Sequence, residues 1–86
     1  PQDYPIEKLK AEAKPLRIGS LEELAEQWMG HLQQAVAAES QLILEGNATG
    51  EELTNAEARR KAVAERLRVV VESYEGKKGD EAQVDE

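Results

Sequence analysis

The sequence lacks several residue types, and each absence excludes a class of function. Its 86 residues include no cysteine, which excludes both a disulfide framework and a cysteine-ligated metal site. The single histidine, His31, excludes a histidine-rich metal site. Phenylalanine is also absent, and the aromatic residues are Tyr4, Trp28 and Tyr74, so few rings are available to stack on nucleic-acid bases.

Charge and hydropathy exclude further partners. The formal net charge of -7 opposes binding to the phosphates of nucleic acids and to anionic membranes. No apolar run approaches the ~18 residues of a membrane helix, and the first residues do not follow the charged-then-apolar pattern of a secretory leader. We therefore expect a cytoplasmic protein, or one held within a virion or another assembly, that contacts neither nucleic acid nor membrane directly.

A chain of this length is expected to form one small domain. Such a domain buries only about 60–65% of the surface that its unfolded chain exposes. Its core is therefore thin, and small domains commonly gain stability from self-association or from a larger partner. We expect a protein partner or self-association, as a homo-oligomer or as a subunit of a larger complex.

Residues that commonly begin or end helices predict two helices in the first half of the chain. A short helix over about 4–14 ends before Pro15, which disfavours helical backbone in the residue that precedes it. The segment Ser20–Glu23 has the sequence of a capping box, and it opens a second helix over about 21–45. Gly46 then supplies the left-handed residue that commonly ends a helix.

The second half of the chain predicts one more helix and a tail. The segment Thr54–Glu57 has the sequence of a second capping box, and it opens a helix over about 55–75 that ends at Gly76. The remaining residues, 76–86, are polar and charged, which is typical of a flexible tail. The predicted organisation is a single helical domain over 1–75 followed by this tail.

Apolar residues of the two long helices alternate spacings of four and three, the pattern of a coiled-coil seam. Folding the third helix back on the second places these residues opposite one another in a single register: Leu42 and Ala56, Glu39 and Arg60, Ala35 and Val63, Leu32 and Leu67, Trp28 and Val70, Ala25 and Tyr74. Glu39 and Arg60, which interrupt the apolar pattern, thus meet as an interhelical pair. The sequence predicts an all-α, coiled-coil-like antiparallel hairpin with a short N-terminal helix and a flexible acidic C-terminal tail.

Charged residues divide between the two long helices. Between Arg17 and Arg59 every charged residue is a glutamate, whereas basic residues crowd the third helix. This division favours ion pairs between the helices, although each exposed pair contributes little stability. As an alternative, the cluster Arg59–Lys61 binds an acidic partner or a phosphate.

Several large apolar residues lie outside the predicted seam. Part of this surface is expected to lie under the N-terminal segment, but about ten helical residues are too few to cover all of it. Uncovered apolar surface is typical of an interface, with ordinary surface hydrophobicity as the alternative. The predicted interface residues are Met29, Val36, Ile43, Leu44, Val69 and Val71.

Residues capable of catalysis are not grouped in a catalytic pattern. The positions three and four residues away from His31 hold two glutamines, a tryptophan and an alanine, so no carboxylate shares its helix face. The segment Gly46–Gly50 is not followed by the Lys-Ser/Thr pair of a phosphate-binding loop. We predict no catalytic residue, no metal site and no cofactor, and hence a protein that is not an enzyme.

Two functions fit these features. The first is a non-enzymatic protein–protein interaction subunit: an adaptor, a chaperone or a structural component of a larger assembly such as a phage particle or a secretion complex. The alternative is an acidic inhibitor that occupies a basic nucleic-acid-binding surface on a target protein. The first would bind through apolar residues, whereas the second would bind through glutamates and weaken strongly with salt.

Overall fold

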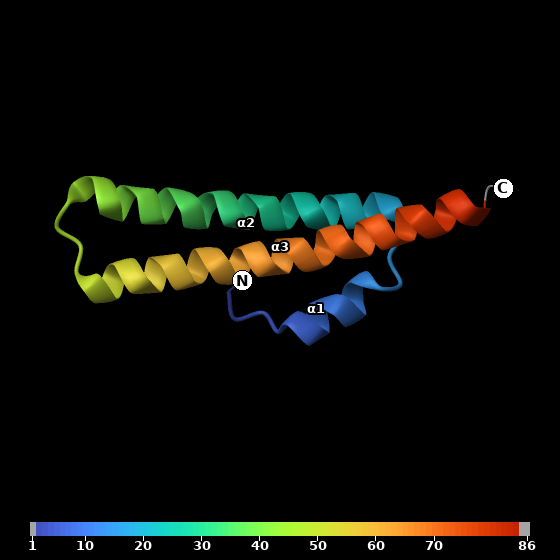
Figure 1. Cartoon of the computed structure of the whole chain (residues 1–86), viewed down its shortest axis with the longest axis horizontal. Coiled ribbons are helices and arrows are strands. Elements are labelled where there is room, and N and C mark those ends of the chain that lie inside the picture. Colours follow the sequence, from blue (N-terminus) through green and yellow to red (C-terminus); the bar gives the residue numbers. More distant parts are fainter. Residues whose placement is uncertain (1, 85–86) are drawn as a thin grey trace.

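The computed structural model describes residues 2–84, with side chains described for residues 2–81. Within this range the chain forms three helices: α1 (Ile6–Ala13), α2 (Ile18–Glu45) and α3 (Gly50–Val84). α2 and α3 lie side by side and antiparallel, which gives an elongated molecule of 58 × 21 × 15 Å (Figure 1). The predicted all-α fold and the antiparallel pairing of the two long helices are confirmed.

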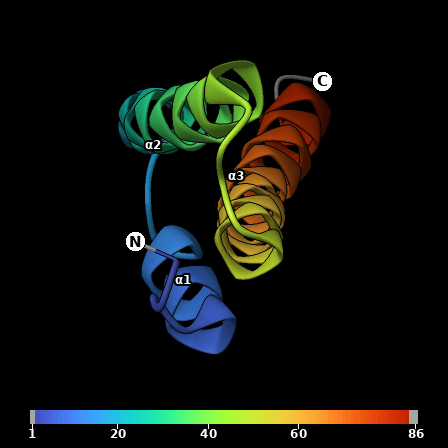
Figure 2. The same ribbon diagram turned by 90° about the vertical axis from the view of Figure 1, so that its left-hand side faces the viewer.

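The short helix α1 packs mainly against α3 (Figure 2). Its buried residues, Leu9 and Ala13, lie one helical turn apart and so share the face that meets α3. Arg66 of α3 donates a hydrogen bond from Nε to the backbone oxygen of Tyr4 at 3.0 Å, which ties the segment before α1 to the same helix. α1 is two residues shorter at its start and one residue shorter at its end than predicted, and it begins after Pro5.

The main core lies where all three helices meet. Its buried members come from α1, α2 and α3, and they are Leu9, Trp28, Val63, Val69 and Val70. Trp28 is 4% exposed and belongs to the same cluster as Val70, so its predicted burial between the long helices is confirmed.

The predicted start of the second helix is wrong, and its predicted end is correct. α2 begins at Ile18 after the extended residue Arg17, and Ser20 lies inside the helix instead of capping it. The earlier start adds a backbone hydrogen bond from Leu21 to Arg17, 2.9 Å long, and Leu21 is fully buried. At the other end, Gly46 adopts a left-handed conformation with φ of 74°, as predicted.

The predicted start of the third helix is also wrong. α3 begins at Gly50, and the functioning capping box is Thr49–Glu52, five residues before the predicted one. The backbone N–H of Glu52 donates to Thr49 Oγ1 at 3.1 Å, and the backbone N–H of Thr49 donates to Glu52 Oε1 at 3.3 Å. Both segments match the motif, and the earlier one adds a further turn of backbone hydrogen bonds to the helix.

Thr49→Ala is expected to lower the free energy of unfolding by about 1 kcal/mol, because it leaves a backbone donor of the first turn without its side-chain acceptor. In a domain of this size the melting temperature should fall by about 4–8 °C, measured by circular dichroism. Thr54→Ala is the matched control, and it should leave stability unchanged or slightly raised, since alanine favours a helix interior. A larger loss in Thr54→Ala than in Thr49→Ala would contradict this assignment.

The third helix continues beyond its predicted end at Gly76, as far as Val84. Glycine ends a helix when it adopts a positive φ, and among the described residues this is true only of Gly46. In this continued part of α3, Lys77 donates a hydrogen bond from Nζ to the backbone oxygen of Lys14 at 3.4 Å. Residues 85–86 of the predicted tail lie outside the described range, and the division between a domain and a tail stays a prediction.

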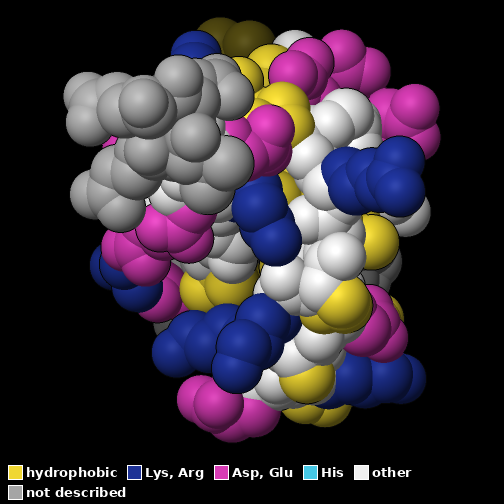
Figure 3. Space-filling model, turned by 90° about the vertical axis from the view of Figure 1, so that its right-hand side faces the viewer, with side chains coloured by type: hydrophobic (Ala, Val, Ile, Leu, Met, Phe, Trp, Pro, Cys, Tyr) yellow, Lys and Arg dark blue, Asp and Glu magenta, His cyan; other side chains and the backbone are white. Residues whose placement is uncertain are grey.

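From Gly76 to Glu81, the last part of α3 whose side chains are described, all residues but the half-buried Lys77 are exposed and bury little apolar surface. Figure 3 views the molecule from this end and shows acidic and basic side chains spread over it, with hydrophobic side chains in smaller areas between them. A chain that ends at Gly76 is therefore expected to melt within about 3 °C of the full-length protein. A melting temperature lowered by about 10 °C or more would show that these turns stabilise the core, and Lys77→Ala in the full-length chain would test the contribution of its one described contact.

Candidate functional site

Four large hydrophobic side chains of α2 are exposed to solvent. The exposed fraction is 46% for Met29, 42% for Val36, 62% for Ile43 and 85% for Leu44. Met29, Val36 and Ile43 are spaced by seven residues, so they follow one line along the helix, and Leu44 adjoins the end of that line. We call these four residues the α2 apolar surface, and all of them belong to the predicted interface.

The two α3 residues of the predicted interface lie in different environments. Val69 is 4% exposed and packs in the core with Leu9, so its assignment to an exposed surface is wrong. It is buried because α1 docks on α3 at this height. Val71 is half-buried and lines a shallow groove of about 300 Å³ together with Met29 and Tyr74. The structure thus brings Val71 and Met29 together and removes Val69 from the candidate surface.

The α2 apolar surface lies on an uncharged part of its helix. From Gln27 to Leu44 Glu39 is the only Asp, Glu, Lys or Arg residue, and the stretch's one histidine, His31, lies in contact with Trp28. Its carboxylate is paired, because Arg60 donates from Nε to Glu39 Oε1 at 2.5 Å. The Glu39 side chain is 17% exposed and that of Arg60 is 34% exposed, so this contact joins α2 to α3 in a partly buried position. The outer face of this stretch therefore presents apolar and neutral polar groups only.

Most ion pairs do not join the two long helices. Within the described side chains, Glu39–Arg60 crosses from α2 to α3, whereas the other pairs form within one helix. Arg68 binds both Glu65 and Glu72, and its hydrogen bond lowers the pKa of Glu65 below the usual value. The expected pairing of an acidic helix with a basic one is therefore wrong in its general form, because helical spacing lets glutamates of α3 reach its own basic residues first.

The basic cluster Arg59–Lys61 is partly neutralised in the same way. Arg60 binds Glu39, and Lys61 binds Glu57 at 2.7 Å, one turn before it on α3. The hydrogen bond from Lys61 lowers the pKa of the Glu57 carboxyl. Arg59 lines a separate shallow depression that also contains Glu52, whose carboxylate opposes the entry of an anion.

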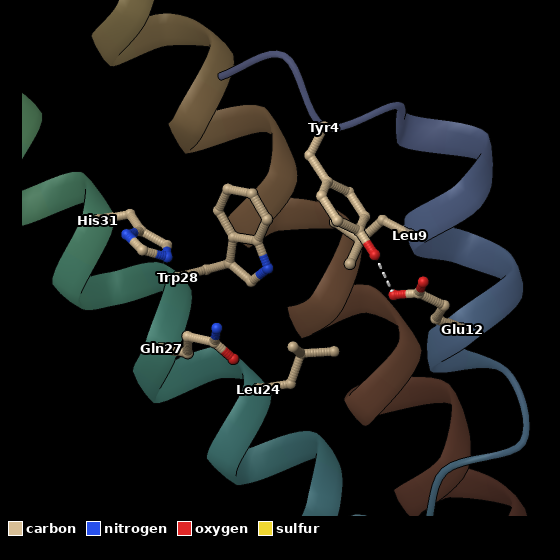
Figure 4. Close-up of a pocket in the computed structure, with 7 residues that line it drawn as sticks. All are labelled: Tyr4, Leu9, Glu12, Leu24, Gln27, Trp28 and His31. Atoms are coloured by element: carbon tan, nitrogen blue, oxygen red, sulfur yellow. Dashed lines mark hydrogen bonds between the residues drawn. The ribbon is translucent and has the colours of Figure 1, made fainter. Parts of the chain in front are cut away.

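A pocket of about 320 Å³ opens between α1 and α2 (Figure 4). Trp28 forms its centre, with the Tyr4 ring edge-on at 6.0 Å and the His31 ring edge-on at 5.2 Å between centroids. The Tyr4 hydroxyl donates a hydrogen bond to Glu12 Oε2 across the opening. This bond, with burial and the charge of Glu12, raises the pKa of Tyr4.

The pocket was not predicted from the sequence. Tyr4 precedes α1 and Glu12 lies at its far end, eight residues on, which is not a spacing that places two residues on one face of a helix. The contact exists because Tyr4 turns back over α1 toward Trp28. The other lining residues are Leu9, Leu24 and Gln27, so this lining contains no hydroxyl or amine nucleophile apart from the tyrosine.

Two further features bear on the class of site. Over the part of the chain that is described, no helix has the length and apolar character required to cross a bilayer. In the same part, acidic and histidine side chains do not gather in threes as they would around a metal ion. No protein-family model, no curated protein and no solved structure matches this chain.

Proposed function

We propose that this protein is a non-enzymatic protein–protein interaction subunit. It acts as an adaptor, a chaperone or a structural component of a larger assembly, such as a phage particle or a secretion complex. The observation that carries the proposal is the α2 apolar surface, whose members are 42–85% exposed on a helix stretch without a free charge. Burying such a surface stabilises a complex and requires no desolvation of charged groups.

The groove beside the α2 apolar surface extends the docking site onto α3. Met29 belongs to both, Val71 and Tyr74 form the α3 side of the groove, and Glu22 and Glu26 lie with Ala25 on its α2 side. A large apolar side chain of a partner fits this position, between the two helices of the hairpin. We place the complex in the cytoplasm or within a virion or other assembly, and we assign it no catalytic step.

The C-terminal residues from Gly76 take no part in this docking site. The described side chains after Lys77 are exposed and include Lys78, Asp80 and Glu81, so they bury little surface against the hairpin. We propose that the acidic, polar C-terminal extension from Gly76 favours solubility.

Capture of partners by the tagged protein from its native source tests the proposal. A specific partner should be retained at about 0.5 M salt, because apolar contacts are not screened. Ile43→Gln, at a position that is 62% exposed, should abolish retention without unfolding the chain. Ile18→Gln makes the same change at the opposite end of α2, at a half-buried position, and should retain the partner once circular dichroism has shown that it is folded. Equal retention by both variants, or no partner at all, would remove the support for this function.

A second candidate function is the acidic inhibitor of a basic nucleic-acid-binding surface. The observation in its favour is the group of exposed carboxylates at the start of α2, from Glu22, Glu23 and Glu26. In that case partner capture should disappear at high salt and tolerate Ile43→Gln. Replacing the three glutamates with glutamine should then abolish capture at low salt, whereas the interaction subunit proposed above would still capture its partner through Ile43, although Glu22 and Glu26 border its groove.

A further inference from the structure

We propose that α2 binds α2 of a second copy of this chain, antiparallel and crossing at Val36. This inference rests on the proposed function, since it names the partner of the α2 apolar surface. α2 lies along one long edge of the molecule, with α3 on one side of it and its outer side uncovered by α1 (Figure 1). Four features of α2 point to a second copy as the occupant of this surface.

The first feature is a stripe that is symmetric about its centre. Met29, Gln33, Val36, Ser40 and Ile43 alternate spacings of four and three, which defines a continuous line on a helix. A two-fold axis at Val36 places Val36 against Val36 of the copy and Met29 against Ile43 of the copy. It also places Gln33 against Ser40 of the copy. Apolar residues thus face apolar residues, and polar residues face polar residues, as a two-fold interface requires.

The second feature is the position of the glutamates. In this antiparallel register the two helices overlap from Gln27 to Glu45, and Glu45 faces Gln27 of the copy. Glu22, Glu23 and Glu26 lie beyond the end of the copy's α2, and Glu39 is paired with Arg60 of its own chain. In a parallel, in-register pair every one of these glutamates would face itself. Two chains that each carry a net charge of -7 repel one another, so the charges favour the antiparallel arrangement.

The third feature is a glycine that packing within the chain does not require. Gly30 lies in the middle of α2, where glycine is less favourable than alanine. A Cβ atom at this position would meet no atom within 4 Å, so the fold itself has room for a side chain. In the antiparallel register Gly30 lies opposite Ile43 of the copy, and the missing side chain lets the two helices approach closely.

The fourth feature is Leu44, which is 85% exposed and therefore buries little of its surface within the chain. In the same register Leu44 lies opposite Met29 of the copy. Met29 is therefore enclosed between Ile43 and Leu44 of the second copy. All four members of the α2 apolar surface are covered by this one contact.

The interface is small. Stable complexes bury about 800 Å² on each partner, and four large apolar side chains from one helix supply only part of that area. We therefore expect a dissociation constant in the micromolar range, with monomer and dimer exchanging in solution. Light scattering or sedimentation equilibrium from about 1 µM to about 1 mM covers this range.

A single substitution tests the contact at the two-fold axis. Val36→Glu places a carboxylate against the same carboxylate of the copy, so it should shift the monomer–dimer midpoint at least tenfold toward the monomer. The site is 42% exposed and glutamate favours helices, so the fold should be retained. Gln34→Glu is the matched control, because it makes the same change of charge on the opposite side of α2 and should leave the midpoint within about twofold.

Cysteine cross-linking tests the register, and the chain contains no cysteine that could interfere. Val36→Cys should form a disulfide-linked dimer on mild oxidation, since its two copies meet at the axis. Met29→Cys alone should not cross-link, whereas a mixture of Met29→Cys and Ile43→Cys should give the mixed dimer. A parallel pair would instead cross-link at each of these positions with itself, and that result would overturn the proposal.

The outcomes separate this inference from the proposed function. If the protein is a monomer throughout the concentration range, the α2–α2 contact is overturned. If it nevertheless captures a partner, and Ile43→Gln abolishes that capture, the interaction subunit remains supported. A dimer unaffected by Val36→Glu would overturn the proposed contact as well. The α2–α2 contact is supported if the dimer forms with rising concentration and Val36→Glu dissociates it. The same dimer must also cross-link only in the antiparallel pattern.

Discussion

Trp28→Ala is expected to lower the free energy of unfolding by about 3–5 kcal/mol. The Trp28 side chain is 4% exposed, and it belongs to the cluster where the three helices meet. Domains have a total stability of about 5–15 kcal/mol, and a chain of 86 residues is expected near the lower end of that range, so this variant should lose most of its stability. Helical circular dichroism during urea denaturation measures the effect without relying on the lost tryptophan fluorescence.

Two control variants show whether this loss comes from the core. Trp28→Phe keeps a ring in the cluster and should cost about 1–3 kcal/mol. Met29→Ala changes the next residue of α2, which is 46% exposed, and should cost less than about 1 kcal/mol. Equal losses in Trp28→Ala and Met29→Ala would mean that the inward face of α2 is assigned incorrectly.

Reversing the charge of Arg60 is the second substitution with a large expected effect. Arg60→Glu removes the partner of Glu39 and places a second carboxylate beside it, which should cost about 1–3 kcal/mol. The loss should lie toward the lower end, because the Arg60 side chain is 34% exposed and water screens part of the interaction. Combining it with Glu39→Lys restores a pair of opposite charges and should recover part of the lost stability.

A double-mutant cycle at these two positions measures their coupling directly. Lys61→Glu is the control, since Lys61 neighbours Arg60 but binds Glu57 on the exposed side of α3. It should cost much less stability than Arg60→Glu, and its effect should not change when Glu39 is replaced. Absence of coupling between positions 39 and 60 would show that the interhelical contact contributes no stability in solution.

The pairing of the two long helices was predictable because it follows from a repeating pattern. Successive turns of the paired helices add apolar residues to the seam, with one charged layer at Glu39 and Arg60, so one register must satisfy many positions at once. Glu39 and Arg60 contact one another where that register places them. The exposure of Met29, Val36, Ile43 and Leu44 follows from the same periodicity, because each lies off the seam.

The helix ends were less predictable because each depends on a few local contacts. Two capping-box sequences occur near the start of α3, and the motif alone does not distinguish Thr49 from Thr54. Gly76 resembles Gly46 in sequence context, yet the backbone of Gly46 alone takes a positive φ among the described residues. Burial of Val69 depends on where α1 docks, and the bond from Tyr4 to Glu12 depends on how the chain turns before α1. Neither contact produces a repeating pattern of residues in the sequence.

The docking of α1 has a consequence for the order in which the molecule folds. α2 and α3 meet across a short turn, whereas the bonds from Arg66 to Tyr4 and from Lys77 to Lys14 span 62 and 63 residues of chain. Contacts between distant residues form more slowly than local ones, and a helix of eight residues does not persist alone. The hairpin should therefore assemble first and α1 should join it last. The amides of α1 should also exchange with solvent before those of the hairpin, through openings that uncover Val69.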